Sequence, residues 1–317
     1  MRRSSQLECI YLSNTWGLHD QRWCKALESL GYSVIREKPV SDQANLPIIT
    51  GPLTSIDPAI LELDNPVIGL SWGFDLHDLE AANSTYWLPR LAGLIVDSDP
   101  TLEIALNSGM PAERIAMIPW GIELDQFVPT RTGSRDAVPR PRLLTLRAHE
   151  SLYRVDTVIR AVKLLHDQRF ACELIVGNDG SLTDQLVKLV DELQIPDVSF
   201  IGKSAESDLP DLFDSADIYI SAAETDGTSV TLLQAMSMKV PVVVSDSPGN
   251  VAIISPADTR GARGTLFSIG DPQSLAQAIT SAWSEPSITQ SKVDAAWEFV
   301  QNSADWNHNI KRLLPLL

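Results

Sequence analysis

The residues best suited to ligand chemistry form one short polar stretch, residues 225–229, which separates two apolar segments. A helix that begins within this stretch presents free backbone N–H groups and the positive end of its dipole, an arrangement that suits a phosphate. Gly227 lets a ligand approach the backbone closely. Gln234 follows Asp226 by eight residues, so a continuous helix would separate their side chains by roughly 12 Å along its axis. The stretch therefore predicts either a site for an extended ligand, such as a nucleoside diphosphate sugar, or an ordinary capped helix.

The segments around this stretch predict a strand, a helix and a second strand. Residues 218–222 are apolar and too few for a helix. Apolar side chains at helical spacing continue from Val230 until Lys239 and Pro241 end the pattern. Residues 242–244 are three valines, which indicate a parallel strand that is buried on both faces. These elements form a βαβ unit that carries the polar stretch after its first strand.

Residues 226–250 resemble the donor-binding segment of the retaining GT-B glycosyltransferases of family four. That family's segment contains an acid, seven residues, Glu-Ala-Met, a short gap, Pro-Val-Val and a loop with glycine, and this sequence reads DGTSVTLLQAMSMKVPVVVSDSPGN. The resemblance implies that Asp226 binds the hydroxyls of the donor sugar and that Gln234 binds the ribose. Both positions most commonly carry Glu in the family. Asp has a shorter reach, and Gln keeps one acceptor oxygen but lacks the charge.

Further residues of the C-terminal half match the family. Arg147 directly follows an apolar strand, and the resemblance implies that it neutralises the leaving diphosphate. The family places a Lys a few residues later, which is absent here. Arg154 lies in that neighbourhood, where it either substitutes for the Lys or is a surface residue at a helix start. Ile201, Gly202 and Lys203 end the strand whose backbone holds the nucleotide base in relatives.

The resemblance also implies donor-binding residues in the N-terminal half. Gly17 lies in the loop after the first predicted strand, where relatives have a glycine loop that faces the phosphates, although a plain turn explains it equally well. Trp72 and Asp75 match a His-Gly-x-Asp motif of the family. Trp72 cannot accept a proton, so stacking on a sugar ring is its expected role, and Asp75 either caps the following helix or binds a hydroxyl. His19 is a weaker candidate, either a general base or a surface residue.

The predicted site has two catalytic residues, Arg147 and Asp226. The predicted donor-binding residues are Gly17, Trp72, Asp75, Arg154, Ile201, Gly202, Lys203, Gly227, Thr228, Ser229, Val230 and Gln234. We predict no metal ligands. Asp97-Ser98-Asp99 follows an apolar strand and could hold Mg²⁺, but the helix that follows explains Ser98 and Asp99 as capping residues, and the predicted donor site lies elsewhere.

The composition favours a two-domain protein that avoids anionic partners. A chain of 317 residues is long enough for two domains with full cores. The net charge of −16 opposes binding to nucleic acid and to anionic lipid, because the attraction to phosphate is reversed in sign. Residues 1–130 contain 8 Lys and Arg against 17 Asp and Glu. We therefore expect a soluble or neutral glycan or small-molecule acceptor.

The sequence also predicts a cytoplasmic location. No apolar run approaches the length of a transmembrane segment. Glu8 interrupts the N-terminal stretch that would otherwise resemble a signal peptide. Cys9, Cys24 and Cys172 are odd in number and lack metal-binding spacing, so we expect buried free thiols, as in a reducing compartment.

Strand and helix patterns alternate before and after a polar segment, which predicts two Rossmann-like domains. The N-terminal domain is expected at residues 1–130 and is shorter than in relatives. Residues 131–141 are rich in Pro and Arg without periodicity and form the predicted linker. The nucleotide-sugar-binding domain is expected at residues 142–298, followed at 299–317 by a C-terminal helix that the resemblance brings back to the first domain. The fold class implied is α/β, a GT-B fold of two doubly wound domains that face each other across a cleft.

The resemblance implies a retaining glycosyltransferase with same-face attack, no metal, no cofactor and no covalent sugar intermediate. Its donor is a nucleoside diphosphate sugar, expected to be UDP-linked. One alternative is a non-catalytic GT-B subunit that supports a partner glycosyltransferase, motivated by Gln234, the absent Lys and the short first domain. The other is a sugar-nucleotide 2-epimerase, which needs several ionisable groups that this sequence largely lacks.

Overall fold

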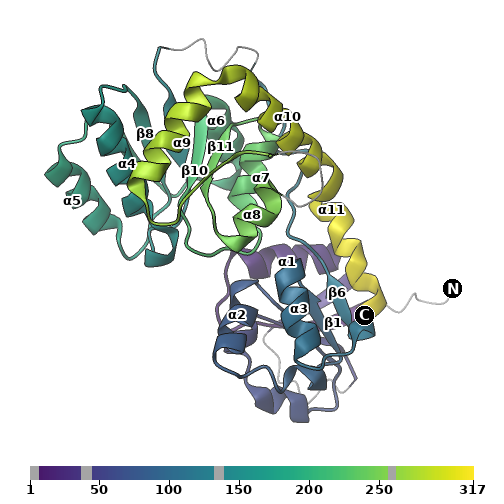
Figure 1. Ribbon diagram of the computed structural model, residues 1–317. Helices are drawn as coiled ribbons and strands as arrows, with labels where there is room; N and C mark the ends of the chain where they lie inside the picture. The colour runs from purple at the N-terminus through teal and green to yellow at the C-terminus, as the bar shows by residue number, and fades with distance from the viewer. Residues whose placement is uncertain (1–6, 37–44, 132–138, 256–261) are drawn as a thin grey trace. The chain divides into compact units, whose positions relative to one another are not determined.

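The computed structural model describes residues 7–36, 45–131, 139–255 and 262–317 (Figure 1). These residues divide into two compact units. The first unit combines Met1–Trp120 with Trp306–Leu317, and the second unit is Gly121–Asp305.

A parallel six-stranded sheet forms the centre of the first unit, with the strand order β2-β1-β3-β4-β5-β6. Its strands are β1 (Leu7–Leu12), β2 (Tyr32–Ile35), β3 (Ile48–Thr50), β4 (Val67–Leu70), β5 (Gly93–Val96) and β6 (Ile115–Met117). Its helices are α1 (Leu18–Ser29), α2 (Phe74–Ala81), α3 (Asp99–Asn107) and, at the end of the chain, α11 (Trp306–Asn309), which a 3-10 helix at Ile310–Leu316 continues.

A second parallel six-stranded sheet forms the centre of the second unit, with the order β12-β11-β10-β7-β8-β9. Its strands are β7 (Arg142–Thr145), β8 (Glu173–Gly177), β9 (Val198–Gly202), β10 (Ile218–Ser221), β11 (Val242–Ser245) and β12 (Thr265–Phe267). Its helices are α4 (Val155–Asp167), α5 (Thr183–Leu193), α6 (Leu209–Ser215), α7 (Val230–Ser237), α8 (Pro248–Ile254), α9 (Pro272–Ser284) and α10 (Pro286–Ser303).

Side chains from both faces of the second sheet pack against helices, as expected for parallel strands rich in Val, Ile and Leu. Successive residues of a strand point to opposite faces. Leu143 therefore belongs to the core shared with α4, α5 and α9, whereas Leu144 belongs to the core shared with α6, α7, α8 and α10. In strand β10, Ile220 likewise belongs to the first of these cores and Tyr219 to the second. Two helical layers thus hold the strands of this unit in a fixed register.

The first compact unit ends at a different residue from the predicted N-terminal domain. The first unit ends at Trp120, ten residues before the expected boundary at residue 130. Residues 121–130 belong to the second unit because the side chains of Ile122 and Phe127 are buried in its core. The predicted linker, residues 131–141, lies for the most part outside the described residues.

The C-terminal helix predicted at residues 299–317 is interrupted. Helix α10 ends at Ser303, and the carbonyl oxygen of Ala304 accepts a hydrogen bond from the Ile122 N–H at 2.8 Å. Asp305 also pairs with Ile122 in a parallel bridge. The backbone leaves the helical conformation to make these contacts, and Trp306 begins the segment that belongs to the first unit.

The cysteines behave as the sequence predicts. Cys9, Cys24 and Cys172 are free and buried, and burial raises the pKa of the Cys9 and Cys172 thiols to about 12.

None of the helices in the described part of the chain combines the length and apolar character that crossing a lipid bilayer requires.

Candidate functional site

The strand order of the second unit reverses between β7 and β10. Successive strands run from β7 toward β8 and β9 on one side, and from β10 toward β11 and β12 on the other. In open α/β sheets such a reversal leaves a crevice at the carboxyl ends of the two neighbouring strands, where ligands bind. Arg147 follows β7 and Asp226 follows β10. Two residues that the sequence analysis assigned to catalysis therefore meet at this crevice.

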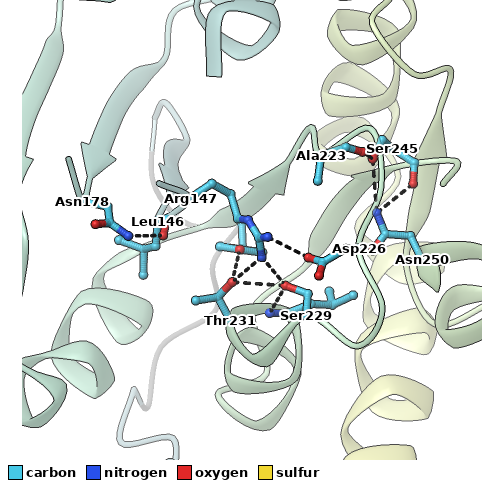
Figure 2. A network of polar contacts seen from close by, with 11 residues as sticks. Leu146, Arg147, Asn178, Ala223, Asp226, Ser229, Thr231, Ser245 and Asn250 are labelled. Atoms are coloured by element: carbon cyan, nitrogen blue, oxygen red, sulfur yellow. Dashed lines mark hydrogen bonds and ion pairs between the residues drawn. The ribbon is translucent and has the colours of Figure 1, made fainter. Parts of the chain in front are cut away.

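Arg147 is the centre of a buried polar network at this edge (Figure 2). Its Nη2 lies 2.7 Å from Oδ2 of Asp226. Its Nη1 donates to Oγ of Ser229 at 2.6 Å and to Oγ1 of Thr231 at 3.3 Å. The Arg147 side chain is 9% exposed and that of Asp226 is 19% exposed. The structure thus joins Arg147, Asp226 and Ser229, three of the predicted site residues.

Three residues that the sequence analysis did not identify complete this network. Thr231 accepts a hydrogen bond from the Tyr219 hydroxyl at 2.7 Å. The Tyr153 ring stacks on the guanidinium, with 4.2 Å between Cζ of Arg147 and the ring centroid. A tyrosine inside the apolar strand 218–222 and a threonine on the apolar helix were signals in the sequence, because buried hydroxyls need hydrogen-bond partners.

The electrostatic environment keeps the Arg147 guanidinium charged. Burial alone would lower its pKa, but the Asp226 carboxylate, followed by Tyr219 and Tyr153, raises the pKa above its ordinary value. Burial also raises the pKa of the Tyr219 hydroxyl, which therefore remains a hydrogen-bond donor. The site presents a permanent buried cation to any anionic ligand that reaches it.

Helix α7 begins at Val230, later than the sequence suggested. Ser229 is its N-cap, with Oγ accepting a hydrogen bond from the N–H of Leu232 at 3.4 Å. Gly227 and Thr228 lie in the loop before the helix rather than in its first turn. The predicted spacing of roughly 12 Å between Asp226 and Gln234 assumed a continuous helix, and this premise does not hold, because Asp226 lies before the helix.

Residues from the following strand and helix hold the Asp226 loop in place. The Ser245 hydroxyl donates to the carbonyl oxygen of Ala223 at 2.5 Å, and Nδ2 of Asn250 donates to the Ser245 carbonyl oxygen at 3.0 Å (Figure 2). Gly249 packs directly on the loop, since a Cβ atom at this position would lie 2.1 Å from the carbonyl oxygen of Asp226. The sequence analysis noted a glycine loop here but did not assign this contact.

Gln234 lies inside α7 and is only 5% exposed. Its carbonyl oxygen Oε1 is buried and accepts no hydrogen bond from the described residues. Leaving a buried acceptor unpaired costs free energy, and such atoms in native structures mark strain, water or ligand sites. A ligand hydroxyl is therefore a chemically suitable partner for this oxygen.

Arg154 has partners that tie it to the surface of the same unit. Its Nη1 lies 2.6 Å from Oε1 of Glu224, and its Nε lies 3.1 Å from Oδ1 of Asp156. These two carboxylates raise the pKa of the guanidinium. Of the two roles considered for Arg154, this geometry matches a surface residue at the start of α4.

The residues expected to hold the base lie at the end of strand β9. Ile201 is exposed, and the carbonyl oxygen of Gly202 accepts a hydrogen bond from the Asn178 N–H at 2.7 Å. Nζ of Lys203 lies 2.8 Å from Oδ1 of Asp179. Because β9 is two strands from β7, this end of the sheet lies about 10 Å from the strand that carries Arg147. Such a distance suits the remote part of an extended ligand.

Two predicted donor-binding residues of the first unit, Gly17 and Asp75, make hydrogen bonds within the protein. The Gly17 N–H donates to Oδ2 of Asp20 at 2.5 Å, so it is not open to a phosphate. Asp75 is fully buried, and its carboxylate accepts hydrogen bonds at 2.7 Å from the Leu53 N–H and from the Ser71 hydroxyl. Burial raises the pKa of the Asp75 carboxyl. Of the two roles considered for Asp75, this geometry matches the capping of α2, since its Oδ1 also accepts from the N–H groups of Trp72 and Leu76. The predicted donor contacts of Gly17 and Asp75 gain no support from these internal partners.

Trp72 is half-buried and contacts other aromatic residues of the first unit. The centroid of its ring lies 5.1 Å from that of His19, which lies 4.5 Å from that of Trp120. Its indole Nε1 donates no hydrogen bond to the described residues. Stacking on a sugar ring remains a prediction for Trp72.

One hollow in the described part of the second unit is separate from this network. It has a volume of about 420 Å³ and is lined in part by Asp217, Lys239 and Trp283. Asp217 and Pro241 precede β10 and β11, so it lies near the amino ends of these strands. The Arg147 network, whose side chains can bind an anion, is therefore the candidate site rather than this hollow. No group of three or more metal-binding side chains occurs among the described residues.

Comparisons with known proteins agree with the architecture. A family model described as Glycosyl transferases group 1 matches residues 134–298. The amylovoran biosynthesis glycosyltransferase AmsK of Erwinia amylovora is 30% identical over 179 residues, which cover 54% of this chain and 42% of AmsK. The chain spans less than half the length of the first curated relatives that it matches.

Two solved structures share the fold over almost the whole chain. Anabaena Alr3699/HepE in complex with UDP and glucose has a TM-score of 0.74 at 14% identity, covering 98% of both chains. Sucrose-phosphate synthase from Thermosynechococcus elongatus has a TM-score of 0.73 at 16% identity, covering 98% of this chain and 97% of the other. The two parallel six-stranded sheets with surrounding helices are thus a GT-B fold, as predicted. Since the family model covers more than half of the sequence, the chain belongs to the glycosyl transferases group 1 family.

Proposed function

We propose that the protein is a glycosyltransferase that moves a sugar from a UDP-linked donor to a hydroxyl group of a neutral acceptor. The observation that carries this proposal is the buried Arg147 guanidinium, which lies at the reversal point of the second sheet and beside the first turn of α7. A cation and a helix start together favour a diphosphate. The relatives named as glycosyltransferases, and the HepE complex with UDP and glucose, support a nucleotide sugar as the donor.

In the proposed mechanism the leaving diphosphate is stabilised electrostatically. Arg147 and the backbone N–H groups at the start of α7 bind the charge that develops as the sugar bond breaks. Removing one such donor in enzymes typically costs about 2.7 to 4 kcal/mol of transition-state stabilisation. Asp226 orients the donor sugar through its hydroxyls, and Oε1 of Gln234 accepts a hydrogen bond from the ribose. The ends of β9 hold the base.

We propose further that transfer retains the configuration of the sugar and needs no metal. In this proposal Asp226 binds the hydroxyls of the donor sugar and is not a nucleophile, in keeping with the family resemblance, which implies no covalent intermediate. The acceptor hydroxyl attacks on the same face as the leaving group, and the leaving phosphate accepts its proton. Arg147 would supply the positive charge that a divalent cation provides in other transferases. The buried free thiols fit a reducing, cytoplasmic setting.

Hydrolysis of UDP-sugars without an acceptor tests this proposal. Purified protein is incubated with UDP-glucose, UDP-galactose and UDP-N-acetylglucosamine, each with and without EDTA, and the released sugar is followed by proton NMR. The proposal predicts that the α anomer appears first and that EDTA does not change the rate. Initial release of the β anomer would contradict retention, and loss of activity with EDTA would contradict metal independence.

A non-catalytic subunit that supports a partner glycosyltransferase is the second candidate. The observation in its favour is Gln234, which replaces the charged residue that is most common in the family. Such a subunit would bind a nucleotide, or none, and would hydrolyse no donor sugar in the same experiment.

A further inference from the structure

Arg147 and Asp226, the two main ligand-binding residues of the proposed site, form a buried ion pair with each other. Nη2 of Arg147 and Oδ2 of Asp226 are 2.7 Å apart, and both side chains are largely buried. A diphosphate that takes over the Nη2 N–H paired with Asp226 displaces the Asp226 carboxylate, and one that binds the second Nη2 N–H lies beside that carboxylate as a second anion. The displaced carboxylate then needs another hydrogen-bond donor, because an unpaired charge in a buried position is costly.

We propose that this ion pair makes Asp226 a specificity-determining residue that favours a sugar-bearing nucleoside diphosphate over the bare nucleoside diphosphate. The inference rests on the proposed function and adds a means of discrimination to it. The bare diphosphate gains Arg147 but leaves Asp226 unpaired beside a second anion. A donor with its sugar supplies hydroxyl groups that donate to Asp226 and replace the guanidinium. The site thus binds the substrate well and the nucleotide product poorly.

The remaining contacts of Arg147 make this exchange of partners feasible. Nη1 donates to Ser229 at 2.6 Å and to Thr231 at 3.3 Å, and the Tyr153 ring covers a face of the guanidinium at 4.2 Å. None of these contacts involves the Nη2 atom that is paired with Asp226. The guanidinium can stay in position while Nη2 changes its partner from a carboxylate to a phosphate. When the sugar leaves, Asp226 can pair with Arg147 again, which promotes release of the product.

The test compares the affinity for UDP of the wild type and the Asp226→Asn variant by titration calorimetry, with GDP and ADP used in parallel. Asn keeps the shape of Asp but removes the charge that competes for Arg147. We expect UDP to bind about tenfold more tightly to the variant, which is about 1.4 kcal/mol. UDP-glucose should gain little, because the variant also loses the charged acceptor for the sugar hydroxyls.

Glu224→Gln is the matched control. Glu224 lies on the same loop and its loss changes the net charge equally, but its partner is Arg154, which keeps Asp156 at 3.1 Å. UDP affinity should change less than threefold in this variant. Equal tightening in Glu224→Gln and Asp226→Asn would show a general charge effect and would overturn the inference.

The outcomes separate the inference from the proposed function. UDP that binds the wild type, binds Arg147→Ala more weakly and binds Asp226→Asn no more tightly than the wild type would overturn the inference while the proposed function stands. No binding of UDP, GDP or ADP to the wild type or to any variant would overturn both. Thermal unfolding and circular dichroism establish that each variant is folded, and Asp226→Ser replaces Asp226→Asn if the latter is not.

Discussion

Replacing Gly249 with Ala should displace the loop that carries Asp226. A Cβ atom at this position would lie 2.1 Å from the carbonyl oxygen of Asp226 and 2.4 Å from that of Gly227. Real Cβ contacts are essentially never shorter than 3.0 Å, so the Asp226 oxygen must retreat by at least 0.9 Å. Both obstacles are backbone atoms, which cannot rotate away as a flexible side chain can. We expect a destabilisation of about 1 to 3 kcal/mol, as for other overpacked sites.

The same displacement should also reduce the rate of catalysis. A misplacement of about 1 Å in a catalytic group can cost about 100-fold in rate, so kcat/KM for the donor should fall by about that factor in Gly249→Ala. Donor hydrolysis measures the rate, and urea unfolding measures stability. Gly17→Ala is the control, because its new Cβ would meet only Oδ2 of Asp20 at 3.9 Å. Normal kcat/KM and normal stability in Gly249→Ala would refute the reasoning about this loop.

Two further predictions concern buried polar side chains. Gln234→Glu should retain or tighten UDP binding, since a charged acceptor makes the stronger hydrogen bond, and it should lower the unfolding temperature of the protein without ligand. Titration calorimetry measures the binding. UDP binding to Gln234→Ala that is as tight as binding to the wild type would contradict this prediction. Burial lowers the pKa of His149 below its ordinary 6.5, so the unfolded state binds more protons and the free energy of unfolding should fall as the pH drops from 7.5 to 5.5. In urea unfolding, the stability difference between the wild type and His149→Gln should shrink over this range. A constant difference would contradict the prediction.

The sequence was sufficient for the elements whose signals are local. The valines at 242–244 lie within strand β11, and the helical spacing that continues from Val230 corresponds to helix α7. Alternating strand and helix patterns were likewise enough to predict two doubly wound sheets. The break in the C-terminal helix could not be predicted, because it depends on the pairing of Ile122 with residues 304 and 305, which are remote in the sequence.

The side-chain partners were harder to predict than the positions of the residues. Asp75 lies where the motif suggested, yet its carboxylate accepts from the N–H of Leu53, 22 residues earlier in the chain. Arg147 likewise contacts Ser229, which is 82 residues away. Sequence spacing does not reveal such contacts, since tertiary packing alone decides which polar groups satisfy each other. The motif therefore indicated a candidate site, and the structure was needed to show which of its polar groups have internal partners.

The most direct test of the central claim is the affinity of Arg147→Ala for UDP, measured by titration calorimetry beside Arg154→Ala. Hydrogen bonds to charged groups are worth about 1.5 to 3 kcal/mol. If Arg147 binds the diphosphate, its loss should weaken UDP binding by about 10- to 100-fold, and loss of Arg154 should have a much smaller effect. Equal UDP affinity in the wild type and Arg147→Ala would contradict the claim that the phosphates lie at the start of α7.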